Sequence, residues 1–271
     1  MNIFYSILLG IVQGITEFLP ISSSGHLALA EHYLGLEEAT LTFDVALHLG
    51  TLVAILIYFR MDFIMIAQAF LTPGKVGNEA PRLRKVFYFI CLGTIPGVLA
   101  GLFLHDIVES FLRQPLYIAM ALGVVALLML AGERMGAHRR DFHTLTVKDA
   151  IIIGLAQAAA IVPGVSRSGI TMTAGLFRGL NRQAVARFSF LLSAPIIFGA
   201  GVYKIPEIIN HGLTGDNFAN YIAGFLSAVI SGYISIAFLL RYIRTRTFDI
   251  FAYYRFGLAC VVFAVLLLQN L

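Results

Sequence analysis

The chain has 271 residues, of which 59% are apolar and only 13% are charged, and its mean hydropathy is +0.85. Soluble domains are about 45–50% apolar and about 25% charged, so this composition excludes a soluble domain and indicates a polytopic membrane protein. The net charge is +4, and the basic residues gather in loops on one predicted side of the membrane, as described below. We therefore expect no nucleic acid as a partner. Cys91 and Cys260 lie in apolar runs and give no disulfide framework.

The chain begins with two apolar segments that are too short to be ordinary spans. A helix needs about 20 apolar residues to cross the hydrocarbon layer; Ile3–Leu19 is marginal and His26–Leu36 is shorter still. Between them, Pro20 ends a helix and Gly25 permits a tight turn. We interpret the two segments as a re-entrant helix-turn-helix pair, whose turn must be surrounded by protein or a wet cavity.

The second half of the chain repeats this arrangement. Asp149–Val162 is again short, runs into the turn PGVSRSG at Pro163–Gly169, and is expected to return as Ile170–Gly179. The segment Arg60–Lys85, which contains proline and glycine, is expected to be a loop. The predicted fold is therefore an all-α polytopic membrane protein, one domain over residues 1–271, with two re-entrant pairs and six transmembrane helices. The six predicted spans are Leu41–Phe59, Val86–Leu104, Leu116–Gly132, Phe188–Tyr203, Phe218–Leu240 and Phe248–Leu268.

The basic residues test this layout, because cytoplasmic loops carry an excess of lysine and arginine. Four segments that would share one side hold fifteen Lys and Arg residues, and the two opposite loops hold one each, Arg113 and Lys204. The four basic segments are Arg60–Lys85, Glu133–Lys148, Arg178–Arg187 and Arg241–Arg246; the two opposite loops are His105–Pro115 and Lys204–Asn217. They share a side only if both short pairs are re-entrant, so both termini are predicted outside the cytoplasm.

An internal repeat relates the two halves, which cover approximately residues 1–132 and 149–271. At an offset of 144 residues, Gly10, Gln13, Ser22, Ser24 and Gly25 match Gly154, Gln157, Ser166, Ser168 and Gly169. By the charge pattern, the two re-entrant pairs enter from opposite sides, so the repeat has inverted topology. In such folds the two broken elements meet near the membrane midplane and form the binding site there.

The first turn carries groups suited to metal and acid–base chemistry. Gln13 and Glu17 lie one helical turn apart and offer hard oxygen ligands for Mg²⁺ or Ca²⁺. His26 can transfer a proton, and the serine run supplies hydroxyls at Ser22, Ser23 and Ser24. The structural alternatives are an interfacial histidine and serines that only cap helices.

The second turn carries groups suited to a phosphate. Arg167 offers a planar, bidentate fork, and the turn around Ser166, Ser168 and Thr171 can aim hydroxyls and backbone N–H groups at an anion. The alternative for Arg167 is a buried structural ion pair with Glu17. Two further residues, Asp44 and His48, are spaced i, i+4 and either extend the site or form an interfacial polar pair.

Both signatures, QGITEFLPISSSGH at Gln13–His26 and PGVSRSG, resemble those of the bacterial undecaprenyl-diphosphate phosphatase family of the bacitracin-resistance type. The similarity covers essentially the whole chain, including FDVALHLGT at Phe43–Thr51. It implies an enzyme of the bacterial inner membrane that removes the terminal phosphate of undecaprenyl diphosphate, recycles the carrier lipid for peptidoglycan synthesis and confers bacitracin resistance. It also implies a divalent cation and a site that opens on the periplasmic side.

The resemblance assigns roles to individual residues. The first position of the family's Glu/Gln-x-x-x-Glu motif is Gln13 here, which leaves Glu17 as the main ionic ligand. Ser23 matches the proposed nucleophile or phosphate ligand, Arg167 the phosphate-binding arginine, and His26 the catalytic histidine. Attack by Ser23, with a phosphoserine intermediate, and direct attack by water both remain open.

Two other assignments fit part of the sequence. A prenyl-phosphate lipid transporter or flippase would use the same residues to hold a headgroup without cleaving it, because inverted repeats are typical of transporters. A second lipid phosphatase superfamily pairs a PSGH-like segment with SR-x5-H-x3-D, but Thr173 stands where that pattern requires histidine, so we reject it. Membrane lipids are expected around the spans, and a homodimer remains open.

Overall fold

The computed structural model describes residues 2–34, 41–207 and 217–269, and every regular element in these ranges is helical. Five helices are long and apolar enough to cross a membrane, or six if α3 and α4, which are bent by 70°, count as one span. The helices are α1 (Ile3–Phe18), α2 (Ser23–Leu34), α3 (Leu41–Tyr58), α4 (Arg60–Leu71), α5 (Pro73–Val76), α6 (Ala80–Phe111), α7 (Pro115–Met135), α8 (Val147–Ala159), α9 (Arg167–Phe177), α10 (Arg182–Glu207), α11 (Asn217–Tyr242) and α12 (Asp249–Gln269), with 3-10 turns at Gly77–Glu79 and Phe142–Thr144. The prediction of an all-helical polytopic membrane protein is confirmed.

The prediction that Arg60–Lys85 forms a loop is wrong. Its first part is helix α4, because Arg60–Leu71 contains neither glycine nor proline and places buried Ile66 and Ala69 on one face. Pro73 and Gly77 limit the short helix α5 and do not unwind the whole segment. The helix α6 then begins at Ala80, earlier than the predicted span. Of the predicted elements, the last two residues of His26–Leu36 and most of the loop Lys204–Asn217 lie outside the described residues.

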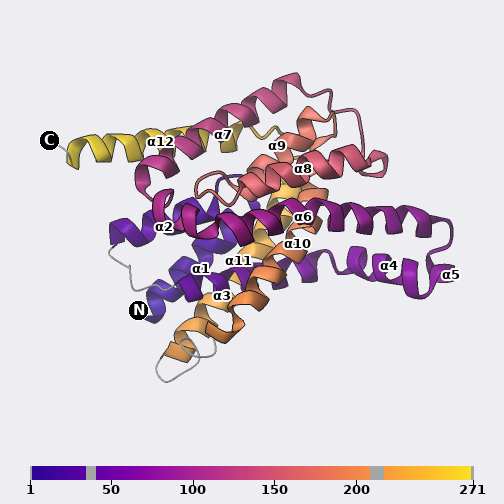
Figure 1. Ribbon diagram of the computed structural model, residues 1–271, viewed down its shortest axis with the longest axis horizontal. Coiled ribbons are helices and arrows are strands. Elements are labelled where there is room, and N and C mark those ends of the chain that lie inside the picture. Colours follow the sequence, from indigo (N-terminus) through magenta and orange to yellow (C-terminus); the bar gives the residue numbers. More distant parts are fainter. Residues whose placement is uncertain (1, 35–40, 208–216, 270–271) are drawn as a thin grey trace.

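The first helix of each short pair packs along a long helix of the other half (Figure 1). Helix α1 lies against α11, and α8 lies against α6. The close approach requires glycine, since a Cβ added at Gly10 would lie 2.3 Å from Gly224 O and one added at Gly154 would lie 2.6 Å from Gly93 O. Gly10 and Gly154 are a matched pair of the sequence repeat. The same close helix–helix contact, which we call the seam, therefore occurs twice, between α1 and α11 and between α6 and α8.

The hydrophobic core brings the end of α1 against α10. Phe18 is fully buried and packs edge to face on Phe190, with ring centroids 5.5 Å apart. Glu17, the preceding residue, pairs with Arg167 at the start of α9.

The helix ends around α4, α7 and α10 are joined by ion pairs. Arg182 pairs with Glu133 at 2.6 Å, and Arg187 pairs with Asp62. In Figure 1 this end, marked by α4 and α5, lies opposite the end where both chain termini are found.

Candidate functional site

The two turns meet, as expected from the repeat. Arg167 Nη2 donates a hydrogen bond to Glu17 Oε1 at 2.7 Å, although the two residues are 150 positions apart. Ser168 Oγ donates to Leu19 O at 3.1 Å. A second bond therefore joins the turn after α1 directly to the first turn of α9.

The two turns are built alike. Ser22 and Ser166 both have positive φ, 78° and 70°, a conformation that costs a non-glycine residue free energy. Each hydroxyl accepts the backbone N–H three residues on, from Gly25 at 3.3 Å and from Gly169 at 3.1 Å. Matching positions of the repeat thus make matching hydrogen bonds.

Glu17 is the centre of the polar cluster. It is only 7% exposed, and its Oε2 accepts hydrogen bonds from Ser23 Oγ at 2.6 Å and Gln13 Nε2 at 3.1 Å. The Nε2 atom of His48 lies 3.6 Å from the same oxygen. Ser23 is therefore held against a carboxylate that can accept its proton, while Arg167 balances the carboxylate charge.

Arg167 is held from two sides. Its Nη1 donates to Ser189 O at 3.2 Å, and Nη2 is the donor to Glu17. A guanidinium has five N–H groups, so Arg167 keeps donors for an anion beyond these two bonds.

Several hydroxyls predicted to bind phosphate have partners inside the protein. Thr171 Oγ1 donates to Arg167 O at 2.7 Å and lies 2.7 Å from Ser189 Oγ. Ser24 Oγ lies 3.4 Å from Ser22 Oγ, and Ser168 Oγ lies 3.2 Å from Ser166 Oγ. In this structure these side chains fix the shape of the turns.

His26 faces a residue that the sequence analysis did not identify. Its Nδ1 lies 2.7 Å from Ser22 O, which can only accept, so Nδ1 carries the proton. Its Nε2 lies 2.8 Å from Tyr254 Oη, and the two rings stack 5.7 Å apart. Within the described ranges no hydrogen bond joins His26 to Glu17 or Arg167.

His48 lies in the site, whereas Asp44 contacts Arg113. The Nδ1 of His48 donates to Asp44 O at 2.8 Å, which turns Nε2 towards Glu17. The carboxylate of Asp44 lies 3.6 Å from Arg113 Nη2. Of this pair, only the histidine reaches the polar cluster.

A cavity of about 380 Å³ opens beside Glu17 and Arg167. Its polar lining also includes His48 and Gln157. The rest of the lining is small or apolar and comes from α3, α6, α8, α10 and the turn after α8: Val45, Gly97, Gly101, Ala158, Ala160, Ile161, Ile196, Ile197, Ala200 and Gly201. A polar end and an apolar wall suit a ligand with a charged head and a hydrocarbon chain.

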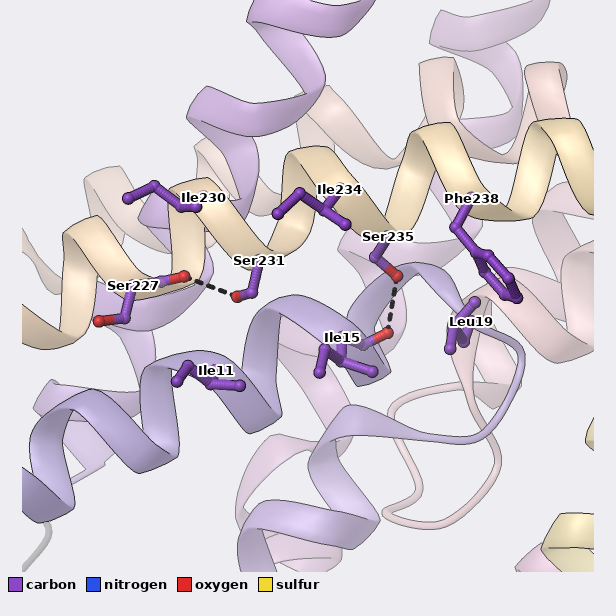
Figure 2. A pocket seen from close by; sticks show the side chains of 9 residues that line it. All are labelled: Ile11, Ile15, Leu19, Ser227, Ile230, Ser231, Ile234, Ser235 and Phe238. Carbon is purple, nitrogen blue, oxygen red and sulfur yellow. Dashed lines mark hydrogen bonds between the residues drawn. The ribbon is translucent and has the colours of Figure 1, made fainter.

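A larger groove of about 610 Å³ lies between α1 and α11 (Figure 2), but its lining contains no ionisable side chain. Ile11, Ile15 and Leu19 line it, on the face of α1 away from Glu17. The serine hydroxyls in it are turned onto backbone carbonyls, as in the 3.0 Å bond from Ser235 Oγ to Ile15 O. We therefore place the functional site in the smaller cavity.

Arg255 of α12 contacts both turns, and the sequence analysis did not identify it as a site residue. It is fully buried, and its guanidinium donates to Pro20 O at 3.3 Å, Gly164 O at 2.7 Å and Val165 O at 3.1 Å. An ionisable residue inside a span is a functional candidate by default. That argument singled out Glu17, and it applies equally to this lone arginine in an apolar span.

The described residues contain no group of three or more His, Cys, Asp or Glu side chains placed to hold a metal ion. Of the two metal ligands predicted from the sequence, Glu17 is engaged by Arg167 and Ser23, while the Oε1 of Gln13 is buried without a partner among the described residues. A free carbonyl oxygen next to a carboxylate is a hard donor pair, the type that Mg²⁺ and Ca²⁺ prefer.

Fold and site together define a class: an all-helical, multi-pass membrane protein whose paired serine-rich turns present arginine, glutamate and serine at one buried centre. The family model of the bacitracin resistance protein BacA matches residues 6–261, and the chain belongs to this family. Its relatives include proteins named undecaprenyl-diphosphatase. That of Rubrobacter xylanophilus is 44% identical over 99% of this chain and all of its own length, and that of Gemmatimonas aurantiaca is 46% identical over 98% of both chains. That of Desulforudis audaxviator is 45% identical over the full length of both.

Proposed function

We infer that this chain is a membrane phosphatase that hydrolyses undecaprenyl diphosphate to undecaprenyl phosphate and inorganic phosphate. This reaction recycles the carrier lipid for peptidoglycan synthesis and accounts for bacitracin resistance. Family membership and the name of the relatives support the substrate. The observation that carries the chemistry is the chain of contacts from Arg167 through Glu17 to Ser23 across the two turns.

We propose that the pairs α1–α2 and α8–α9 are re-entrant and that six spans cross the membrane, in inverted repeats of approximately residues 1–132 and 149–271. The matched turns support this arrangement, as does the packing of α1 and α8, each of which lies against a helix of the other half. Both termini lie at one end of the molecule, opposite α4 and α5, which supports their placement on one side of the membrane. We propose that this side, and the side on which the site opens, is periplasmic.

The diphosphate is placed in the cavity beside Arg167, whose free N–H groups take its oxygens. Ser22, Ser24, Ser166, Ser168 and Thr171 are assigned to the phosphate site as the residues that shape the two turns. The charge of the buried Arg255 adds a positive potential at both turns. The prenyl chain leaves between α6 and α10, where glycine and alanine leave room.

Gln13 and Glu17 are the residues that would hold a divalent cation. A single carboxylate is sufficient, because Mg²⁺ is often held by one or two carboxylates together with water and substrate phosphate oxygens. When bound, the ion neutralises charge that develops on the phosphate oxygens. Binding would engage the Oε1 of Gln13, which is buried without a partner among the described residues.

Two routes to hydrolysis fit this geometry. In one, Ser23 Oγ gives its proton to Glu17 and bonds to the terminal phosphorus as the bond to the bridging oxygen breaks and undecaprenyl phosphate leaves; water then cleaves the phosphoserine to inorganic phosphate. In the other, water attacks the phosphorus directly and Ser23 binds the phosphate. His26 is proposed as the proton-transfer residue, oriented by Ser22 and Tyr254. Labelled phosphate trapped on Ser23 would establish the first route.

Phosphate release by the purified protein in detergent tests the proposal. A transporter needs two compartments, whereas a phosphatase releases phosphate from undecaprenyl diphosphate without them. We expect release by the wild type and a loss of about 10²-fold or more in Arg167→Ala, whose phosphate donor is gone. Binding of the diphosphate without release would instead indicate the flippase.

A further inference from the structure

Gln157 lines the cavity but has no part in the reaction described above. It lies on α8, is only 3% exposed, and shares the cavity with Glu17, His48 and Arg167. It corresponds to Gln13 in the sequence repeat. A polar side chain at this position therefore faces the place where the diphosphate is proposed to bind.

One hydrogen bond fixes the orientation of the Gln157 amide. Nε2 donates to Gly93 O on α6 at 3.3 Å. A carbonyl oxygen only accepts, so the nitrogen must face α6. The Oε1 atom is buried and has no hydrogen-bond partner among the described residues.

A buried acceptor without a donor costs about 1–3 kcal/mol, so its presence calls for a water, an ion or a ligand. Ionised phosphate oxygens are themselves acceptors and cannot pair with Oε1. A second cation is disfavoured, since Oε1 is a single neutral ligand beside the guanidinium of Arg167. A water molecule has the matching chemistry, because it donates one hydrogen to Oε1 and keeps a lone pair for phosphorus.

We propose that Gln157 is a positioning residue that holds the attacking water through Oε1. The assignment rests on the proposed function and favours water as the nucleophile. The water oxygen bonds to the terminal phosphorus as the bond from that phosphorus to the bridging oxygen breaks. The electron pair leaves with the prenyl monophosphate, and both water hydrogens end on inorganic phosphate: R–O–PO₂–O–PO₃³⁻ + H₂O → R–O–PO₃²⁻ + H₂PO₄⁻.

Two variants of the full-length protein in detergent test this role. Gln157→Met keeps an unbranched side chain and removes the acceptor. Gly154→Ala is the structural control, because its Cβ would press on Gly93 O in the same α6–α8 seam without lining the cavity. For each, kcat, KM, Tm and the affinity for a methylene-bridged prenyl diphosphonate are measured.

We expect Gln157→Met to lower kcat by about 10–100-fold, since misplacing a reactant has costs of this order. KM and the diphosphonate affinity should stay within about threefold of wild type. An unchanged kcat in Gln157→Met, or a loss that follows Tm as in Gly154→Ala, would overturn the assignment. A wild type that binds the diphosphonate but releases no phosphate would overturn the proposed function itself.

Discussion

At the scale of single residues, Arg255 explains how two turns from opposite halves keep one geometry. The carbonyls of Pro20, Gly164 and Val165 point at one buried guanidinium. A turn outside regular structure leaves carbonyls unpaired, and inside a membrane protein water does not replace the missing donors. The arginine supplies those donors to both turns.

Removing this guanidinium should loosen both turns together. In Arg255→Met each orphaned buried carbonyl costs about 1–3 kcal/mol, so we expect a lower Tm and a loss of turnover of at least about tenfold. Arg246→Met, at an exposed position, is the control and should change neither. Thermal unfolding and phosphate release on the same preparations check this, and a fully active Arg255→Met would contradict it.

His26 and Tyr254 form the second residue-level prediction. If Tyr254 orients the imidazole through the 2.8 Å contact with Nε2, Tyr254→Phe should lower kcat several-fold and leave KM unchanged. His26→Ala should remove nearly all turnover while the protein still folds. Steady-state kinetics of both variants provide the measurement, and near-normal turnover in His26→Ala would refute its assignment.

At the scale of elements, the sequence predicted the helix-breaking turns and most of the long apolar helices, because proline, glycine and apolar length are local signals. It did not predict α4, because proline and glycine beyond Leu71 were taken to mark the whole segment as a loop. It also could not place Tyr254 or Gln157, since their roles depend on contacts between helices far apart in the chain.

The first turn of α8 is anchored by Asp149. Burial would raise the pKa of its carboxyl, but hydrogen bonds from Arg140, Thr146 and Arg178 outweigh burial and lower the pKa to about 2. A lowered pKa in the folded state stabilises the protein above the carboxyl's ordinary pKa of about 4, and this contribution is lost as the pH falls through about 2.

We therefore expect Asp149→Asn to lower Tm by several degrees at neutral pH, because Arg140 and Arg178 lose their partner. The gap to the wild type should shrink between about pH 4 and pH 2, where the wild-type carboxyl itself becomes protonated. Tm measured across this range is the test, and a gap that does not change with pH would show that the charge is not the cause.

The passage between α6 and α10 gives a prediction about chain length. Ala200 is exposed and lines the cavity, so Ala200→Phe should narrow the path proposed for the prenyl chain. The loss in kcat/KM should be greater for undecaprenyl diphosphate than for the shorter farnesyl diphosphate. Ile222→Phe, at an exposed position outside the cavity lining, serves as the control. Equal losses on both substrates would place the chain elsewhere.

At the scale of the whole molecule, the proposed function depends on two halves that contribute one turn each. The first half brings Glu17 and Ser23, the second brings Arg167, and the packing of α1 on α11 and of α8 on α6 holds them together. Neither turn alone combines a carboxylate, a hydroxyl and a guanidinium. We therefore propose that the repeat seen in the sequence supplies both the scaffold and the site.

A double-mutant cycle on phosphate release tests this claim most directly, using Glu17→Gln, Arg167→Ala and the double variant. If the two residues act as one unit on one phosphate, each single change should lower kcat/KM by about 10²-fold or more, and the double variant should be little worse than the weaker single variant. Losses that multiply in the double variant would show that Glu17 and Arg167 act independently, and would contradict a site shared between the two turns.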